Sequence, residues 1–270
     1  MSGSHARGAQ GGVALAIVLW FVAGMAILVA GVVAQARTDV RMAQLHVAKA
    51  RATALGDGAI NLALAELAQL SNGESVPRGL ARFVVGDSDI FVRVQPVSGL
   101  IDLNRVDENL MQTLLADYAR LPGGEARQLA GNLQYWRSGE GRGGKRRFES
   151  TEDLLRVPGF NRAEYDAIRD VVTASGRGSS PTRWENAPVA LQSLATDAGR
   201  DVRRGNRRAL SEDELLMDGP FRIDALVKIG EETWLRRRWY STGVVNDSVL
   251  PYRPTRIEPP RVVRDDELAL

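Results

Sequence analysis

The sequence predicts an α+β fold in which a long N-terminal helix packs on an antiparallel sheet, and a large all-α subdomain is inserted into that sheet. Three observations predict it. A short leader precedes an uncharged apolar run, a helical pattern continues after this run, and alternating segments flank a long helical stretch. Because helices repeat every 3.6 residues and strands every two, the order of these patterns gives the order of the elements.

The composition excludes several classes of function. The chain has 270 residues, 44% of them hydrophobic and 25% charged, with a formal net charge of +2. These values are typical of one or two compact domains and indicate no strong field for nucleic acid. Cysteine is absent, so a disulfide framework and a cysteine nucleophile are excluded. The two histidines, His5 and His46, lie in the leader and the first helix, so no histidine-based triad or metal site is expected.

The apolar run is long enough to span a membrane. No charged side chain occurs between Arg7 and Arg37, and residues 13–34 are all apolar or small. As a helix this run measures about 33 Å, and a bilayer's hydrocarbon core is about 30 Å thick. The run is either a cleaved signal peptide, with Ala34-Gln35-Ala36 as the cleavage site, a permanent anchor, or an anchor trimmed at its front edge. Its length exceeds the apolar core of about 7–15 residues in a signal peptide, which argues against complete removal.

The helical pattern continues after Ala36. Arg37, Arg41, Arg51 and Asp57 lie off an apolar stripe whose residues recur at spacings of three, four and seven. Gly56 and Gly58 are expected to mark a bend, since glycine destabilises a helix interior. The segment "SNGESVPRG" ends the helix. The stripe comprises Val40, Val47, Leu55, Ala59, Leu62, Ala63, Leu67 and Leu70.

Alternating segments predict the strands. "LARFVVGDSDIFVRV" predicts a β-hairpin around a turn at residues 86–89. "DGPFRIDALVKIG" and "EETWLRRRWYSTG" predict two later strands that complete the same sheet. The run "RRRWY" at residues 236–240 is expected on an exposed face of its strand. The Pro-rich and charged end of the chain is expected to be an extended tail.

Between residues 104 and 216 the pattern is helical. Asn104 is expected to cap the helix in "RVDENLMQTLLADYARL", and Ser150 or Thr151 the one that begins "EDLLRV". A further helix is expected in "NAPVALQSLA". About 110 residues are too many for a loop between strands, so they predict an inserted helical subdomain.

The leader resembles that of type IV pilins and pseudopilins, in which a prepilin peptidase cuts before the apolar segment and leaves it as the anchor. The resemblance rests on Gly12-Val13 directly before the run, with Arg7 on the short side. It implies a mature N-terminus at Val13. The fifth residue after the cut, Ile17, stands where most of these proteins carry a glutamate that neutralises the amine of the preceding subunit. A subunit with none ahead of it needs no such buried charge, so Ile17 marks a position at the filament tip.

The order of parts resembles the large minor pseudopilin of the type II secretion system, the K component, from Gly12 to about Tyr240. The motifs are "RGAQGGVALAIVLWFVAGM", "KARATALGDGAINLALAEL", "SGLIDLNRVDENLMQTLL", "FESTEDLLRVPGFNRAEYDAI" and "ENAPVALQSL". The resemblance implies a pilin-like fold and a place at the tip of the periplasmic pseudopilus, in the inner membrane by one span, without catalysis. The implied partners are the I and J components, the major pseudopilin, the prepilin peptidase and the inner-membrane assembly platform.

This interpretation divides the chain into seven parts. They are a cleaved leader (1–12), a transmembrane anchor (13–35), the periplasmic half of the first helix (36–72), the first strands (80–100), the inserted helical subdomain (101–216), the returning strands (217–245) and the tail (246–270). The implied site residues are Gly12 and Val13 for processing, Ile17 as the tip marker, and Leu15, Leu19, Trp20, Phe21 and Leu28 in the anchor.

No cofactor is expected, and calcium binding, known in the family, is not expected here. Calcium-binding members carry a D-W-x-D-like acidic stretch in the inserted domain. Aligned on Trp136, this chain has Tyr135 and Ser138 in place of the acids, with Arg142, Arg146 and Arg147 nearby. Ca²⁺ takes six to eight oxygen ligands, mostly from carboxylates, and a basic loop does not supply them.

Two other classes of function remain as alternatives. "LPGGEARQLAGNL" and "VPGFNRAEYDAI" resemble helix-hairpin-helix DNA-binding modules, which would suit a membrane-anchored DNA-uptake protein. Both lack the Gly-hydrophobic-Gly turn that presents amides to phosphate, so packing hairpins are favoured and no nucleic acid is expected. An enzyme is the other class, in which Asp102, Asp107 and Glu108, or the acids of "SEDELLMD", would be paired carboxylates, but no suitable histidine, cysteine or serine accompanies them. These acids lie near helix starts, where solvated caps are the favoured interpretation.

Overall fold

The structure is a computed structural model of the whole chain. It describes residues 11–69, 75–77, 79–139, 146–174, 182–197, 214–216, 219–242 and 251–264. The chain divides into two compact units, residues 1–51 and residues 52–270. The predicted α+β fold is confirmed: a long N-terminal helix, an antiparallel sheet and further helices are present.

The helix α1 runs from Gly11 to Leu67 without interruption. The helix is unbroken at Gly56 and Gly58. Its first part belongs to the unit of residues 1–51 and is rich in exposed apolar side chains. Its last part, from Ala52, belongs to the second unit and packs on the sheet. The helix ends before residue 72, the boundary expected from the sequence.

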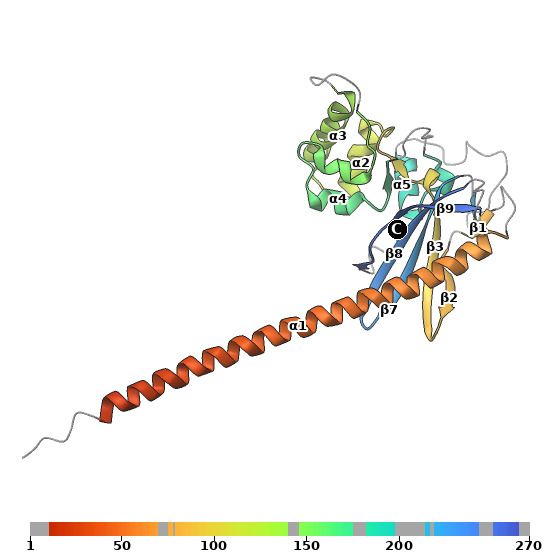
Figure 1. Cartoon of the computed structure of the whole chain (residues 1–270). Coiled ribbons are helices and arrows are strands. Elements are labelled where there is room, and N and C mark those ends of the chain that lie inside the picture. The colour runs from red at the N-terminus through yellow and green to blue at the C-terminus, as the bar shows by residue number, and fades with distance from the viewer. Residues whose placement is uncertain are drawn as a thin grey trace, which may run out of the picture. The chain divides into compact units, whose positions relative to one another are not determined.

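The main sheet is antiparallel, and in the described residues its strands follow the order β10-β8-β7-β3-β2, with β9 also paired to β8 (Figure 1). The hairpin strands β2 and β3 precede the inserted helices, and β7 returns beside β3 as the sequence predicts. Within the segment expected to be an extended tail, β9 and β10 both pair with β8, so these described residues belong to the sheet. The strands are β2 (Ala81–Val85), β3 (Ser88–Pro96), β7 (Phe221–Ile229), β8 (Glu232–Thr242), β9 (Tyr252–Ile257) and β10 (Arg261–Val263).

Two tight turns explain the two long hairpins. Gly86 between β2 and β3 and Gly230 between β7 and β8 have φ values of 60° and 62°. Each is the first of two turn residues, where a type II′ hairpin requires positive φ and therefore favours glycine. These turns match the right-handed twist of the strands and fix their register.

The segment between β3 and β7 is mainly helical and has its own core. Its helices bury Leu114, Leu133 and Ile168 against Phe148, among others. Two short pairings accompany them: β4 (Ile101–Asp102) lies parallel to β5 (Val172–Thr173), and β1 (Ser75–Pro77) pairs with β6 (Glu214–Leu216). The helical elements are η1 (Val97–Gly99), α2 (Glu108–Tyr118), α3 (Gly123–Ser138), η2 (Thr151–Arg156), α4 (Arg162–Ile168), η3 (Trp184–Asn186) and α5 (Val189–Asp197).

The caps of these helices differ partly from expectation. The Asp107 carboxylate, not Asn104, caps α2 by accepting the backbone N–H of Leu110 at 2.8 Å. Asn104 instead bonds both the N–H and the C=O of Phe148, which ties the start of α2 to the segment before η2. Ser150 caps η2 as expected, in a capping box with Asp153. The helical segments were therefore predicted correctly from the sequence, but not every capping residue was.

Candidate functional site

The first part of α1 is the one described helix that is long and apolar enough to cross a membrane. Its apolar side chains are exposed and no part of the run is buried in the unit of residues 1–51. Exposed large side chains include the expected anchor residues Leu15, Leu19, Trp20, Phe21 and Leu28. A continuous exposed apolar surface of this length needs a bilayer or other apolar chains around it.

The expected processing residues lie at the very start of this helix. Gly12 and Val13 are in the first turn of α1, and most of the leader, residues 1–10, lies outside the described residues. Ile17 follows one turn later with its side chain 64% exposed. These three residues therefore lie in one helical segment that begins the exposed apolar surface. Their roles in processing and at the tip stay predictions.

The last part of α1 packs on the sheet through small residues. Ala52, Gly56, Ala59 and Ala63 are buried. A Cβ at Gly56 would lie 2.6 Å from the Cβ of Arg236, closer than side chains pack, so only glycine allows this approach to β8. Of the predicted stripe, Ala59, Ala63 and Leu67 are buried, Val40, Val47 and Leu62 are exposed, and Leu70 lies outside the described residues. The sheet-facing side includes Ile60 and Leu64, which the sequence analysis did not single out.

Asp57 joins the helix to the sheet by charge. Its carboxylate lies 2.7 Å from Arg236 Nε and 2.5 Å from Arg238 Nη2. From the sequence, Asp57 was predicted only to lie off the apolar stripe of the helix. Its partners could not be predicted, because a local pattern does not show which strand lies above a helix. Tyr252 of β9 adds a hydrogen bond from its hydroxyl to the Leu67 carbonyl at the end of α1. The ion pairs of Asp57 with Arg236 and Arg238 thus fix the position of α1 along β8.

The opposite face of the sheet carries a charged ladder. Register places Arg93, Asp224 and Arg237 side by side on β3, β7 and β8. Because side chains alternate along a strand, all three project from one face. Asp224 is completely buried and lies 2.6 Å from Arg237 Nε, 3.3 Å from Arg222 Nε and 3.7 Å from Arg93 Nη2.

The expectation that "RRRWY" lies on an exposed face is therefore wrong. Arg236 and Arg237 are buried, and Tyr240 is buried as well. Arg236 faces Asp57 of α1, while Arg237 faces the ladder on the other side. Both faces of β8 are covered, one by α1 and one by the inserted helical segment. Alternation alone cannot reveal this second cover.

Electrostatics explains why these buried groups stay charged. Burial by itself would raise the pKa of Asp224, but Arg222 and Arg237 outweigh it and lower the pKa to about 2. Burial, with the nearby charge of Arg237, lowers the pKa of Arg222 to about 10, which still leaves it protonated at neutral pH. Burial also opposes ionisation of Asp170, yet Arg237 and Arg261 hold its pKa well below the ordinary value. These are paired structural charges at neutral pH.

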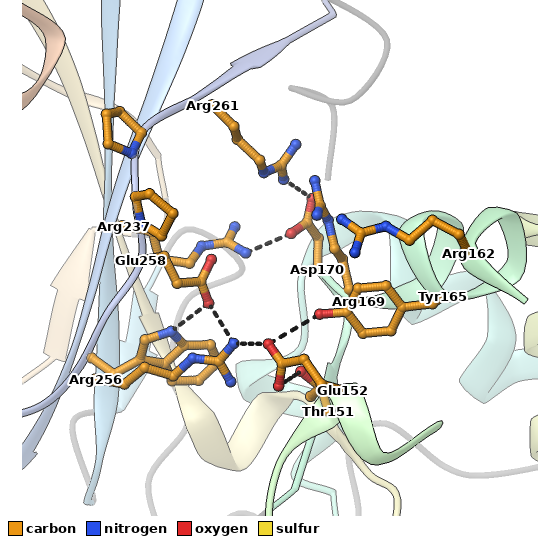
Figure 2. Close-up of a pocket in the computed structure, with 13 residues that line it drawn as sticks. Thr151, Glu152, Arg162, Tyr165, Arg169, Asp170, Arg237, Arg256, Glu258 and Arg261 are labelled. Carbon is orange, nitrogen blue, oxygen red and sulfur yellow. Dashed lines mark hydrogen bonds and ion pairs between the residues drawn. The ribbon is translucent and has the colours of Figure 1, made fainter. Parts of the chain in front are cut away.

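Asp170, directly after α4, docks the helical segment on this ladder. Its carboxylate binds Arg237 Nη1 and Arg261 Nη2, each at 2.5 Å, and its backbone carbonyl accepts a hydrogen bond from Arg222. Glu152 of η2 makes a second link by binding Arg256 of β9. These pairs border a cleft (Figure 2), and its volume is about 290 Å³. The cleft lies between η2 and α4 on one side and β8, β9 and β10 on the other.

The two hairpins of the inserted segment make packing contacts. Gly159, with φ of 90°, lies so close to α3 that a Cβ would lie 2.7 Å from Leu129 Cδ2. Asn132 of α3 donates a hydrogen bond to the Pro158 carbonyl in the same turn. The turn at Pro158-Gly159 therefore packs against α3 of the same chain. Asp102, weighed as a solvated acid, is buried instead and accepts the backbone N–H of Asn104.

The stretch weighed for calcium is aromatic and basic in the described residues. Trp136 stacks on Phe148 with ring centroids 4.5 Å apart, and the Arg146 guanidinium lies 5.5 Å from the Trp136 ring. No group of three or more acidic, histidine or cysteine side chains fit to hold a metal occurs among the residues that the structure describes. Residues 140–145, with Arg142, lie outside them. Whether calcium binds stays a prediction from the sequence.

No protein-family model matches the sequence, and no curated protein matches it. The structure is similar to a chain in "The Crystal Structure of the GspK-GspI-GspJ complex from enterotoxigenic Escherichia coli Type 2 Secretion System". The TM-score is 0.49 and the sequence identity 12%, over 84% of this chain and 100% of that chain. At 12% identity few residues are shared, so residue roles here come from this chain's own geometry.

Proposed function

We propose that this chain is a minor pseudopilin of the type II secretion system, of the K type. The observation that carries the proposal is the two-part helix α1. One end of it is an exposed apolar surface, and the other end packs small residues onto an antiparallel sheet. The sheet in turn accommodates a helical insertion between β3 and β7. The sequence motifs that resemble this family occur in the same order along the chain.

The two parts of the helix suit two environments. An apolar run of this length is stable in a bilayer, because a helix satisfies its own backbone hydrogen bonds there. The same surface can leave the bilayer only for another apolar surface, such as the equivalent helices of other subunits. The unit of residues 52–270 buries its apolar side chains in its own interior and exposes many charged ones, so it belongs in water. We therefore place one span in the inner membrane and the bulk of the chain in the periplasm.

A position at the filament tip follows from Ile17. A glutamate here would neutralise the terminal amine of a subunit ahead, but a buried carboxylate without such a partner is costly in hydrocarbon. A chain that starts at Val13 and carries Ile17 offers its own amine to the next subunit and requires nothing ahead. The proposed partners are the I and J components and the major pseudopilin, with the prepilin peptidase and the inner-membrane platform acting during assembly.

The proposed role is structural, supporting filament initiation and protein export, and involves no catalysis by this chain. The buried carboxylates Asp224 and Asp170 are neutralised by arginines that also hold the fold together. Such paired groups stabilise a structure and are poor proton carriers near neutral pH, since the pKa of each carboxyl lies well below that range.

N-terminal sequencing of the protein from membranes with and without prepilin peptidase tests the class. We expect a mature start at Val13 with the peptidase and an uncut leader without it. Gly12→Leu should abolish the cut, because the scissile backbone must approach the enzyme without a side chain, whereas Gly11→Leu should still be cut. A mature start at Arg37 would show a signal peptide and overturn the proposal, and an uncut Met1 with the peptidase present would indicate a plain anchor.

The tip position has a separate test. Ile17→Glu adds a carboxylate near the start of the apolar run, where the cost is smaller than that of a charge at the centre of a bilayer, about 2.5–3.5 kcal/mol. We expect it to reduce co-purification with the I and J components and to lower export, while Ile17→Leu leaves both unchanged. Full assembly and export by the Ile17→Glu protein would show that a subunit ahead supplies an amine, and would remove this chain from the tip.

A further inference from the structure

The cleft between the helical segment and the sheet has more positive than negative charge on one side. Figure 2 shows Arg162 and Arg169 reaching from α4 toward the place where Arg261 meets Asp170. Arg237 enters the same place from β8. Four guanidinium groups therefore gather at one end of a cavity of about 290 Å³.

Among the described residues, two carboxylates at this end contact four arginines. Asp170 pairs with both Arg237 and Arg261, and Asp166 pairs with both Arg162 and Arg169 at 2.8 and 3.0 Å. Arg237 also pairs with Asp224 in the ladder beneath. The ladder beneath adds Arg93 and Arg222 against Asp224, which increases the positive excess. At the other end of the cleft, Glu152 and Glu258 both pair with Arg256, so two carboxylates face one guanidinium group there.

One donor here lacks an acceptor. In the described part of the chain, the buried Nε of Arg169 makes no hydrogen bond, although its Nη1 is paired with Asp166. A buried N–H of this kind costs free energy unless a partner accepts it. The Tyr165 ring and Trp239 form further walls, and Pro259 and Pro260 line the side next to β10. These walls are rigid and leave room for a small group.

We propose that the arginine-rich end of this cleft is an oxyanion site, which takes a phosphate or the carboxylate of one acidic side chain. Arginine binds such groups through two parallel N–H···O bonds, and the guanidinium groups of Arg162 and Arg169 offer such donors at this end of the cleft. The volume suits a group of this size and is too small for a folded surface. A bound anion neutralises the excess charge and strengthens the contact between α4 and β10. This site is independent of the role of α1.

Isothermal titration calorimetry on the full chain in detergent tests the site, with inorganic phosphate as the probe and sodium chloride keeping the ionic strength constant. We expect saturable binding with one phosphate per chain. Arg162→Gln should weaken it at least about tenfold, the effect of losing one charge-assisted hydrogen bond. The matched control is Arg156→Gln: this arginine is similarly exposed and paired to Asp153 in η2 but does not line the cleft. Its affinity should equal that of the wild type.

A second titration with a capped peptide of consecutive glutamates identifies the source of the anion. Tighter binding of the peptide than of phosphate assigns the site to an acidic protein segment, and the reverse order assigns it to a free oxyanion. We expect Arg162→Gln and Arg156→Gln to remain folded, since both side chains are exposed, and circular dichroism checks this. The proposal is overturned if neither probe binds beyond the effect of equal ionic strength, or if Arg162→Gln and Arg156→Gln weaken binding equally.

Discussion

At the scale of single residues, Asp224 holds the sheet's charged face together. It is fully buried and lies within 3.7 Å of three guanidinium groups, those of Arg93, Arg222 and Arg237. Desolvating a carboxylate is costly, and only this set of partners repays it. The arginines depend on it equally, because Arg222 and Arg237 are themselves buried in the sheet's interior.

Replacing Asp224 by Asn should therefore destabilise the protein strongly. The amide keeps the volume but removes the charge, so the arginines lose their common partner. We expect a loss of about 3–5 kcal/mol in the free energy of unfolding, as for other broken buried ion pairs. Denaturant unfolding of the full chain in detergent measures it. Asp89→Asn breaks an exposed pair with Arg82 and should cost less than about 1 kcal/mol. Similar losses in the two variants would contradict the assignment.

The same carboxylates predict the pH range of stability. Their pKa values are lower in the folded than in the unfolded state, where an aspartate has a pKa near 3.9. The stabilisation is thus fully present above about pH 4 and is lost as the pH falls toward about 2, because the folded state must then take up protons. From pH 5 to 8 the contribution of these two carboxylates to the free energy of unfolding should not change. Asp224→Asn should show a shallower decline in acid than the wild type; an identical decline would exclude Asp224 as a cause.

At the scale of elements, the contact between α1 and β8 combines close packing with charge. Gly56 lets the helix backbone approach Arg236, and Asp57, the next residue, pairs with the same arginine. Ala52, Ala59 and Ala63 are small residues in the same part of α1 and are also buried. A helix that meets a sheet through such small residues fits in one position along it, since any shift would bring larger side chains into the contact.

Gly56→Ala tests this close approach. In an ordinary helix interior, replacing glycine by alanine stabilises by up to about 1 kcal/mol. At Gly56 the new Cβ would lie 2.6 Å from the Arg236 Cβ, so we expect a net loss of about 1–3 kcal/mol instead. Gly131→Ala in α3 is the control, because its Cβ would meet nothing nearer than 3.9 Å and should stabilise. Thermal unfolding distinguishes the two signs. Stabilisation at both positions would show that α1 does not approach β8 this closely.

The longest helix and the strands of the two hairpins were predictable from the sequence because their patterns are local, whereas β9 and β10, in the expected tail, were not predicted. The apolar run, the hairpin around Gly86 and the strands on either side of the helical segment all follow from periodicity and turn residues. The burial of Arg236 and Arg237 was not predictable in this way, since it depends on two distant covers, α1 and the segment around Asp170. The cleft with Arg162 and Arg256 escaped for the same reason: its walls are about 90 residues apart in the sequence.

At the scale of the whole molecule, the unit of residues 52–270 contains two cores linked by polar contacts. One core belongs to the inserted helices, and the other lies between the sheet and the end of α1. The links include Asp170 with Arg222, Arg237 and Arg261, and a hydrogen bond from Gln95 Nε2 to the Asn186 carbonyl. Because each core buries its own apolar side chains, the links determine whether the two unfold together.

Asp170→Ala should separate the two cores. The change removes the carboxylate that binds Arg237 and Arg261, and we expect it to cost about 3 kcal/mol, the low end for a broken buried ion pair, since Arg237 keeps Asp224. In hydrogen exchange of the full chain, η2, α4 and β10 should lose protection, while β3 and β7 keep theirs. Asp166→Ala is the control, because Asp166 is partly exposed and, in the described part of the chain, its ion pairs are with Arg162 and Arg169 of its own helical segment. A uniform loss of protection across all strands and helices would show a single cooperative unit in place of two linked cores.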